Sequence, residues 1–170
     1  HTFDCVECLE NGILYFVTVR CNDQVGLSTM VVSGGLMVDL NGPTVAVAPA
    51  VVTRTTGRAT AYWGSTEDIA LVWGFDDLES GIQQVRALLS TDPTSPLSGS
   101  SDPAALKAMP LALSSDPEER QGVIPLAAAG VNLTHGMRYY LHVCAEDGMH
   151  RTVCGEVYSI LVDLTPPVCG

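Results

Sequence analysis

The chain has 170 residues and is strongly acidic, with 19 Asp and Glu residues against 8 Lys and Arg residues and a formal net charge of −11. This balance argues against nucleic acid and anionic membrane surfaces as partners, because both attract basic patches. Gly, Asp or Pro interrupts every apolar run before about 18 residues, so we expect no transmembrane helix and no membrane insertion. A chain that starts at His1, without Met or an apolar leader, is expected of a processed or excised piece of a longer protein.

The first predicted strand lies within residues 9–23, LENGILYFVTVRCND. Its side chains alternate between two faces, which predicts a half-buried antiparallel strand. The side chains expected to point inward are Tyr15, Val17, Val19 and Cys21, and those expected to point outward are Phe16, Thr18 and Arg20.

Four further strands are predicted in the middle of the chain. They cover residues 44–52, residues 69–75, a stretch that begins at Ile82, and residues 123–128. The second of these contains Trp73, which we expect to be buried. The run DDLESG, residues 76–81, predicts a turn between the second and third strands.

A Ser- and Pro-rich insertion occupies residues 91–122. Its composition predicts a long surface excursion rather than packed structure. Only residues 104–109 have a helical pattern, so we expect one brief helix there.

The last predicted hairpin begins within residues 133–147, LTHGMRYYLHVCAED. Tyr139, Leu141, Val143 and Ala145 are expected inward, and Tyr140, His142 and Cys144 outward. A turn around Asp147 and Gly148 then leads into a strand at residues 156–162, which the pair Pro166 and Pro167 ends because proline cannot donate ladder hydrogen bonds.

The phrase at residues 133–147 repeats the phrase at residues 9–23. Leu133, Gly136, Tyr139, Val143 and Asp147 match Leu9, Gly12, Tyr15, Val19 and Asp23 at one offset, since 139 minus 15 gives 124, and VDLTPP at 162–167 matches VDLNGP at 38–43 at the same offset. Two matching segments at the same offset predict an internal repeat. Residues 44–167 would form one complete unit, residues 1–43 the C-terminal part of a preceding unit, and residues 168–170 the start of a linker or next unit.

Two of the six cysteines follow this repeat. Cys144 and Cys154 flank the predicted turn and fall over Arg20 and Met30 in the first copy, so both are absent together. A bonded pair behaves in this way, and we therefore predict a Cys144–Cys154 disulfide. A disulfide implies an oxidising compartment, so secretion to the extracellular surface is expected.

The other four cysteines are less constrained. Cys5 and Cys8 have the C-x-x-C spacing, but no second such motif completes a zinc site. Cys8 with Cys21 is slightly preferred as a second disulfide on strand proximity. Cys5 and Cys169 then remain unpaired and are candidates for a bond to a neighbouring chain or to another part of the molecule.

The motif L-x-x-G-x-x-Y, ending at Tyr15 and again at Tyr139, resembles the tyrosine corner of fibronectin type III and related immunoglobulin-like sandwiches. The segments at 73–82, 139–147 and 162–167 resemble tandem repeats of very large extracellular proteins of algae and protists, including adhesin-like and mastigoneme-type filament proteins. The resemblance implies an all-β, immunoglobulin-like (fibronectin type III-like) β-sandwich. Glu146 departs from the family's usual Asn.

Three kinds of candidate site follow. The acidic turn residues Asp76, Asp77 and Glu79 are weak candidates for a structural calcium ion, and a solvated turn is the favoured alternative. Asn132 starts an N-glycosylation triplet on a connection expected to be exposed, whereas Ser95 and Pro96 are weak candidates for O-linked glycans or hydroxyproline.

We expect no enzyme, because no nucleophile, base and orienting group converge, and His135, His142 and His150 are interpreted as surface histidines. No cofactor is expected beyond covalent glycans and a structural calcium ion. The predicted function is a structural repeat of a secreted, glycosylated filament or cell-surface protein that assembles with copies of itself or with adjacent repeats. The alternative is an adhesin-type module that binds a carbohydrate or protein.

Overall fold

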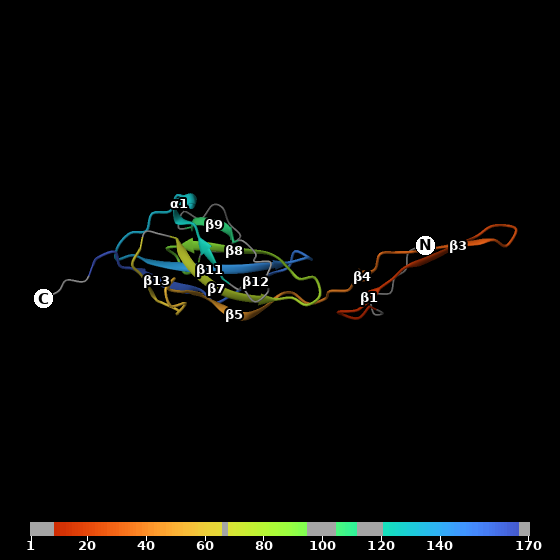
Figure 1. Ribbon diagram of the computed structural model, residues 1–170, viewed down its shortest axis with the longest axis horizontal. Coiled ribbons are helices and arrows are strands. Elements are labelled where there is room, and N and C mark those ends of the chain that lie inside the picture. The colour runs from red at the N-terminus through yellow and green to blue at the C-terminus, as the bar shows by residue number, and fades with distance from the viewer. Residues whose placement is uncertain (1–8, 66–67, 95–104, 112–120, 167–170) are drawn as a thin grey trace.

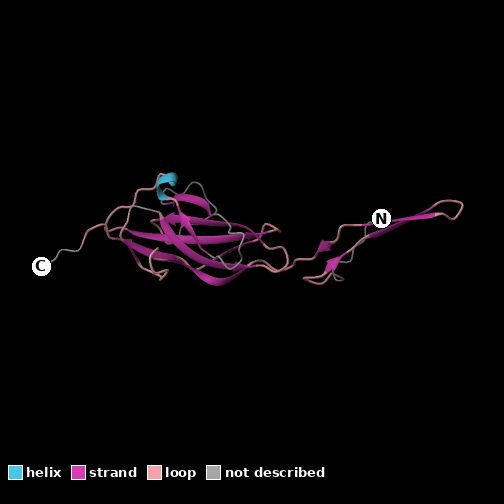
Figure 2. Ribbon diagram, viewed as in Figure 1, coloured by secondary structure: helices cyan, strands magenta, loops and turns pink. Residues whose placement is uncertain are grey.

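Thirteen strands and one short helix make up the described part of the computed structural model, which covers residues 9–65, 68–94, 105–111 and 121–166. The fold is all-β in character, as the sequence predicts, with antiparallel sheets throughout most of its length (Figure 2). In the part of the chain that the structure describes, no helix has the length and apolar character needed to cross a lipid bilayer.

Two sheets form a sandwich from residue 44 onward (Figure 1). The smaller sheet has the order β10-β7-β5, with β5 at Thr44–Val51, β7 at Ile69–Asp76 and β10 at Gln121–Ile124. The larger sheet has the order β6-β13-β11-β8-β9, and β12 also pairs with β11. Its strands are β6 at Tyr62–Trp63, β8 at Ile82–Ser90, β9 at Ala105–Leu111, β11 at Arg138–Asp147, β12 at Thr152–Cys154 and β13 at Tyr158–Val162. We call these elements, with helix α1 at Leu126–Ala129, the sandwich.

The core lies between the two sheets and is built from alternate residues of their central strands. The expected inward set on β11, Tyr139, Leu141, Val143 and Ala145, is buried, and so is Trp73 on β7. The expected outward set is corrected in part: His142 and Cys144 are also buried. Alternation with a period of two predicts that one face of the strand is exposed to solvent, but β11 has buried side chains on both faces.

Residues 9–43 form a separate, thinner unit, which we call the N-terminal unit. It contains two antiparallel ribbons, with β1 at Leu14–Tyr15 pairing β4 at Leu36–Met37 and β2 at Thr18–Asn22 pairing β3 at Ser28–Val32. Figure 1 shows this unit extending away from one end of the sandwich. The prediction that Val17, Val19 and Cys21 point into a core is wrong for this chain, because all three are exposed. Among the described residues, no strand packs on either face of the β2–β3 hairpin, so its alternation buries nothing.

Three boundaries also differ from the predictions. Residues 104–109 were expected to be helical, but Ala105–Leu111 is strand β9, paired with the edge of β8. An open sheet edge offers backbone hydrogen bonds that a short, weak helical pattern cannot match. Residues 123–128 are divided between β10 and α1. The expected strand at 156–162 is β13, which begins at Tyr158, and an additional short strand, β12 at Thr152–Cys154, precedes it.

The offset of 124 residues recurs in the hydrogen-bond register of the two units. In the N-terminal unit Tyr15 lies opposite Leu36, and in the sandwich Tyr139 lies opposite Ile160. Arg20 lies opposite Met30, as Cys144 lies opposite Cys154. The N-terminal unit therefore has the strand pairing of β11, β12 and β13, without counterparts of the other sandwich strands among the described residues.

Candidate functional site

The corner at the start of each repeated strand is held by a tyrosine hydroxyl. The Tyr139 hydroxyl accepts a hydrogen bond from the backbone N–H of Thr134 at 3.0 Å, and the Tyr15 hydroxyl accepts one from Glu10 at 3.0 Å. Gly136 and Gly12 precede these strands with φ of 78° and 73°, a conformation that glycine adopts without strain. The corner geometry that the motif predicts is thus present in both units.

The turn after the repeated strand is also built twice. Asp147 Oδ1 accepts hydrogen bonds from the backbone N–H groups of Met149 and Arg151, each at 2.8 Å. Asp23 Oδ1 accepts the equivalent pair from Val25 and Leu27, at 3.0 and 2.8 Å. At one position of this shared turn, exposed Leu27 in the first copy is replaced by Arg151 in the second.

Arg151 uses that guanidinium to join the two units. Its Nε donates to Asp147 Oδ2 at 2.8 Å, and its Nη2 forms an ion pair with Asp39 of the N-terminal unit. Its Nη1 also donates to the Asp39 backbone carbonyl at 3.4 Å. The side chains of Asp39 and Asp147 are only 2% and 0% exposed. The end of the N-terminal unit is therefore held to the sandwich through an ionic network in which the carboxylates are buried and the Arg151 side chain is 31% exposed.

The predicted turn at residues 76–81 forms the other half of this junction. Asp77 Oδ1 accepts hydrogen bonds from the backbone N–H groups of Glu79, Ser80 and Gly81, at 2.8 to 3.1 Å. Glu79 accepts a hydrogen bond from the side chain of Asn11, whose own Oδ1 accepts the Leu40 backbone N–H at 2.6 Å. A chain of polar contacts thus runs from the corner of the N-terminal unit to the sandwich.

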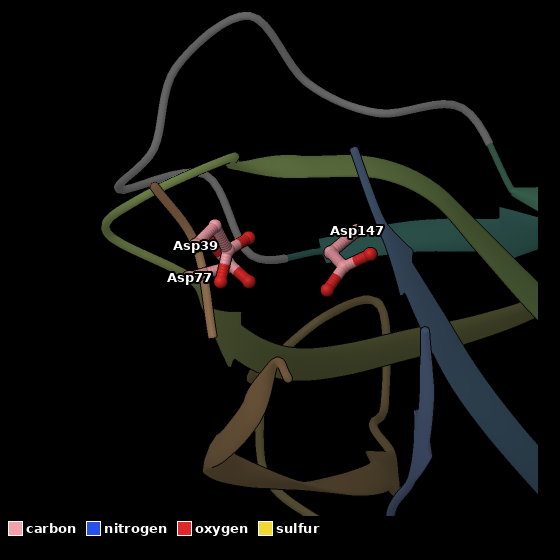
Figure 3. Close-up of side chains that lie close together, drawn as sticks. All are labelled: Asp39, Asp77 and Asp147. Atoms are coloured by element: carbon pink, nitrogen blue, oxygen red, sulfur yellow. The ribbon is translucent and has the colours of Figure 1, made fainter. Parts of the chain in front are cut away.

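The structure groups the acidic residues differently from the sequence. Asp76, Asp77 and Glu79 were the calcium candidates, but the carboxylates that lie close together are those of Asp39, Asp77 and Asp147 (Figure 3). One oxygen from each lies within 4.8 Å of the others. Asp76 ends β7, and Glu79 is engaged by Asn11 instead.

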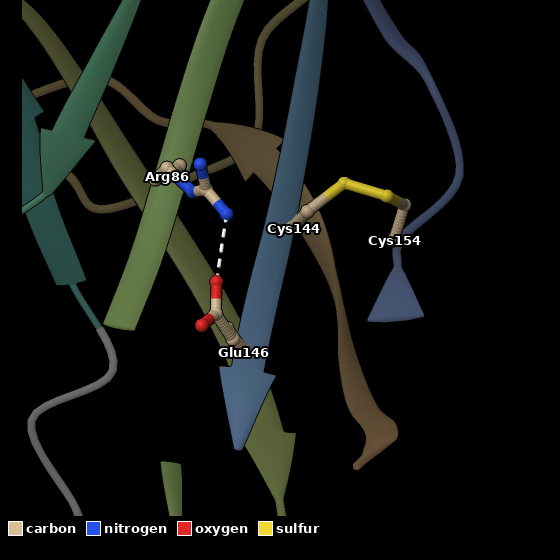
Figure 4. Close-up of a disulfide and its surroundings, with 4 residues drawn as sticks. All are labelled: Arg86, Cys144, Glu146 and Cys154. Carbon is tan, nitrogen blue, oxygen red and sulfur yellow. Dashed lines mark hydrogen bonds and ion pairs between the residues drawn. A yellow bond between two sulfur atoms is a disulfide. The ribbon is translucent and has the colours of Figure 1, made fainter. Parts of the chain in front are cut away.

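The predicted disulfide between Cys144 and Cys154 is confirmed, and it joins β11 to β12 at directly opposed positions (Figure 4). Beside it Arg86 Nη2 contacts Glu146 Oε2 at 2.8 Å, and His150 Nδ1 lies 2.7 Å from Glu146 Oε1. Glu146 is therefore held by two basic side chains.

The remaining cysteines give less information. Cys21 carries a free thiol and is exposed, which corrects the expectation that it is buried. The predicted Cys8–Cys21 disulfide is therefore wrong, because the Cys21 thiol is free. Cys5, Cys8 and Cys169 lie outside the described residues, so any bond that they form stays a prediction.

The glycosylation candidates and the histidines are placed as follows. Asn132 is exposed, as expected of a glycan acceptor, whereas Ser95 and Pro96 lie outside the described residues. His135 is exposed, and its Nδ1 accepts the Leu164 backbone N–H at 3.0 Å. The interpretation of His142 as a surface histidine is wrong, because it is buried on β11.

The buried carboxylate of Asp147 predicts acid sensitivity. Burial alone would raise the pKa of Asp147, but hydrogen bonds from the Arg151 and Met149 backbone and from the Arg151 guanidinium lower the pKa below its ordinary value of 3.8. A lowered pKa contributes stability above pH 3.8, and this contribution is lost as the pH falls through the lowered value. We therefore expect the free energy of unfolding to fall more steeply below pH 3.8 in the native chain than in Asp147→Asn, measured by urea denaturation.

Asp23→Asn is the matched control for this experiment, because Asp23 occupies the equivalent turn without an arginine contact to its carboxylate. Its pH profile should parallel that of the native chain. If Asp147→Asn and Asp23→Asn had the same profile, the ionic network around Arg151 would not be the cause.

No protein-family model and no curated protein sequence matches this chain.

Proposed function

We propose that the chain is a non-catalytic structural repeat of a secreted, glycosylated extracellular filament or cell-surface protein, in which units join end to end. The observation that carries this proposal is the contrast between equivalent positions of the two units. Val143 in the sandwich is 0% exposed, whereas Val19, its counterpart in the N-terminal unit, is 54% exposed. Strand β2 thus has the residue pattern of a core strand, but its side chains are exposed to solvent.

The exposed apolar surface extends along the whole β2–β3 hairpin. Its large exposed side chains include Phe16, Val17, Val19, Met30, Val31 and Val32. An isolated two-stranded hairpin is marginally stable in water, and its open edges pair readily with other strands. Pairing of this hairpin with strands of another unit would therefore stabilise it, because the apolar side chains and the open strand edges would be buried.

The sandwich indicates which strands would supply that cover. On the edge of β11 away from β12 lies β8, with Val143 opposite Ala87. The equivalent edge of β2 is paired with no strand among the described residues. We propose that a strand equivalent to β8 completes it, supplied by an adjacent repeat of a longer chain or by a neighbouring copy.

The sandwich type that we propose is immunoglobulin-like, of the fibronectin type III kind. The tyrosine corner in both units supports this type, since the hydroxyl-to-backbone bond spans five residues in each. The polar junction between the units supports a tandem arrangement, because it holds successive units at a fixed angle.

Extracellular location rests on two observations. The Cys144–Cys154 disulfide favours an oxidising compartment, and Asn132 is exposed within an N-glycosylation triplet. We propose that Asn132 carries a glycan.

Electron microscopy of native material, together with intact and deglycosylated mass analysis, tests this function. We expect regular fibres with glycan density at Asn132 and a mass that falls on deglycosylation. Monodisperse, unglycosylated particles would contradict the proposal and favour the adhesin-type binding module.

A pair of variants tests the role of the hairpin face in solution. Val19→Lys places a charge where the counterpart Val143 is buried, whereas Thr18→Lys places the same charge on the opposite face of the same strand. Sedimentation velocity should show concentration-dependent association of the native chain, loss of association in Val19→Lys and little change in Thr18→Lys. Equal behaviour of the two variants would exclude this face as the contact surface.

A further inference from the structure

Three carboxylates converge at the junction from distant parts of the chain. Asp39 ends the N-terminal unit, Asp77 starts the turn after β7, and Asp147 ends β11 (Figure 3). One oxygen of each lies within 4.8 Å of the others. Calcium binds oxygens at about 2.3–2.6 Å, so oxygens on opposite sides of the ion lie up to about 5 Å apart. The spacing of the three carboxylates suits such an ion.

The charge of the cluster is not balanced by protein groups. Three carboxylates carry three negative charges, and Arg151, which contacts Asp147 and Asp39, supplies one positive charge. A deficit of two charges remains in a site where the side chain of Asp39 is only 2% exposed. Buried charges require partners, because desolvation without compensation is costly. One divalent cation would make the local charge zero.

Two oxygens in the cluster also have no hydrogen-bond partner among the described residues. These are Asp39 Oδ2 and Asp77 Oδ2, both of which are inaccessible to solvent. The Ser80 hydroxyl, which is neutral, also faces the Asp39 carboxylate and lowers its pKa, but it leaves the charge of the cluster unchanged. Asp77 Oδ1 is already occupied by three backbone N–H groups, so the turn is complete without Oδ2. Buried acceptors without partners are rare in folded proteins, and an unplaced ion is one of the established explanations.

We propose that Asp39, Asp77 and Asp147 bind a calcium ion at the junction of the two units. The donors are all carboxylate oxygens, which suit hard cations rather than zinc or copper. Calcium accepts irregular coordination, whereas magnesium demands near-ideal octahedral geometry at about 2.0–2.1 Å. The ligands come from three separate segments that hold the oxygens in a loose arrangement, which favours calcium.

This site would tie the N-terminal unit to the sandwich, because Asp39 belongs to the first and the other two ligands to the second. It depends only on groups within one chain. Calcium binding at the junction would therefore not require the units to assemble into filaments.

Calcium titration of the chelator-treated, 170-residue chain by isothermal calorimetry and thermal unfolding tests the inference. We expect a dissociation constant of about 10⁻⁴ to 10⁻³ M, the range of extracellular modules. At about 10 mM calcium, roughly ten times the weakest of these values, the unfolding midpoint should rise by about 3 °C. Magnesium at the same concentration should give a smaller rise.

Asp77→Asn is the decisive variant, because the asparagine Oδ1 can still accept the three backbone hydrogen bonds of the turn while the second carboxylate oxygen is lost. We expect calcium affinity to fall by about tenfold or more. Asp163→Asn is the matched control, since Asp163 is the counterpart of Asp39 and lies at the other end of the sandwich; its affinity should equal that of the native chain.

Calcium-free unfolding curves show whether each variant folds, and Asp39→Asn replaces Asp77→Asn if the latter does not. Absence of heat and of a midpoint shift in the native chain would overturn the inference. Equal calcium affinity in the native chain and in the folded cluster variant would also overturn it, because binding would then come from the general acidic surface.

Discussion

Leu141→Ala should lower the free energy of unfolding by about 2–5 kcal/mol, the range measured for buried leucines in protein cores. Leu141 lies at the centre of β11 and is 0% exposed, so truncation removes buried methyl groups and leaves a cavity between the two sheets. Urea denaturation of the native and variant chains, monitored by tryptophan fluorescence, would measure the difference because Trp63 and Trp73 both lie in the sandwich core.

The matched control for this experiment is Val17→Ala at the equivalent position of the N-terminal unit. Val17 is 64% exposed, so its truncation should change stability by no more than about 0.5 kcal/mol. If Val17→Ala lowered the free energy of unfolding as much as Leu141→Ala does, Val17 could not be exposed in solution. The hairpin would then be packed against another unit or another copy of the chain.

Removal of the disulfide by Cys144→Ala with Cys154→Ala should cost about 2–3 kcal/mol. The two cysteines are 10 residues apart, and closure of a loop of this length restricts the unfolded chain by about that amount in the chain-entropy account. Urea denaturation under oxidising conditions measures the loss. The native chain treated with a reducing agent should unfold at the same urea concentration as the double variant.

Cys21→Ala is the control for the disulfide experiment, because Cys21 is an exposed free thiol. Its substitution should leave the unfolding midpoint unchanged. If the double variant were as stable as the native chain, the β11–β12 pairing alone would be sufficient to hold this hairpin.

The strands of the sandwich could be predicted because hydrophobic alternation has a period of two along each of them. The same alternation could not show that Val19 is exposed and Val143 is buried, since the two positions carry the same residue in the same pattern. Burial depends on which strands lie opposite, and this is a property of the assembled sheets. The burial of His142 and Cys144 on the other face of β11 was missed for the same reason.

The candidate site was predicted only in part. Asp77 was identified with its chain neighbours Asp76 and Glu79, because short acidic turns are visible in a sequence. Asp39 and Asp147 lie 38 and 70 residues from Asp77 and meet it only when the N-terminal unit docks on the sandwich. The available signal was the repeat itself, since Asp39 stands in one of the two repeated words and Asp147 ends the other.

The far end of the sandwich reproduces the end of the N-terminal unit. The Leu164 N–H donates to His135 as the Leu40 N–H donates to Asn11, and Asp163 stands where Asp39 stands, 124 residues earlier. Recurrence of the same contacts at that end would relate every unit to the next by one rotation and one translation. When the same rotation and translation relate every pair of neighbouring units, the units form a helical filament. The angle between the two units at this junction would then determine the pitch and handedness of that filament.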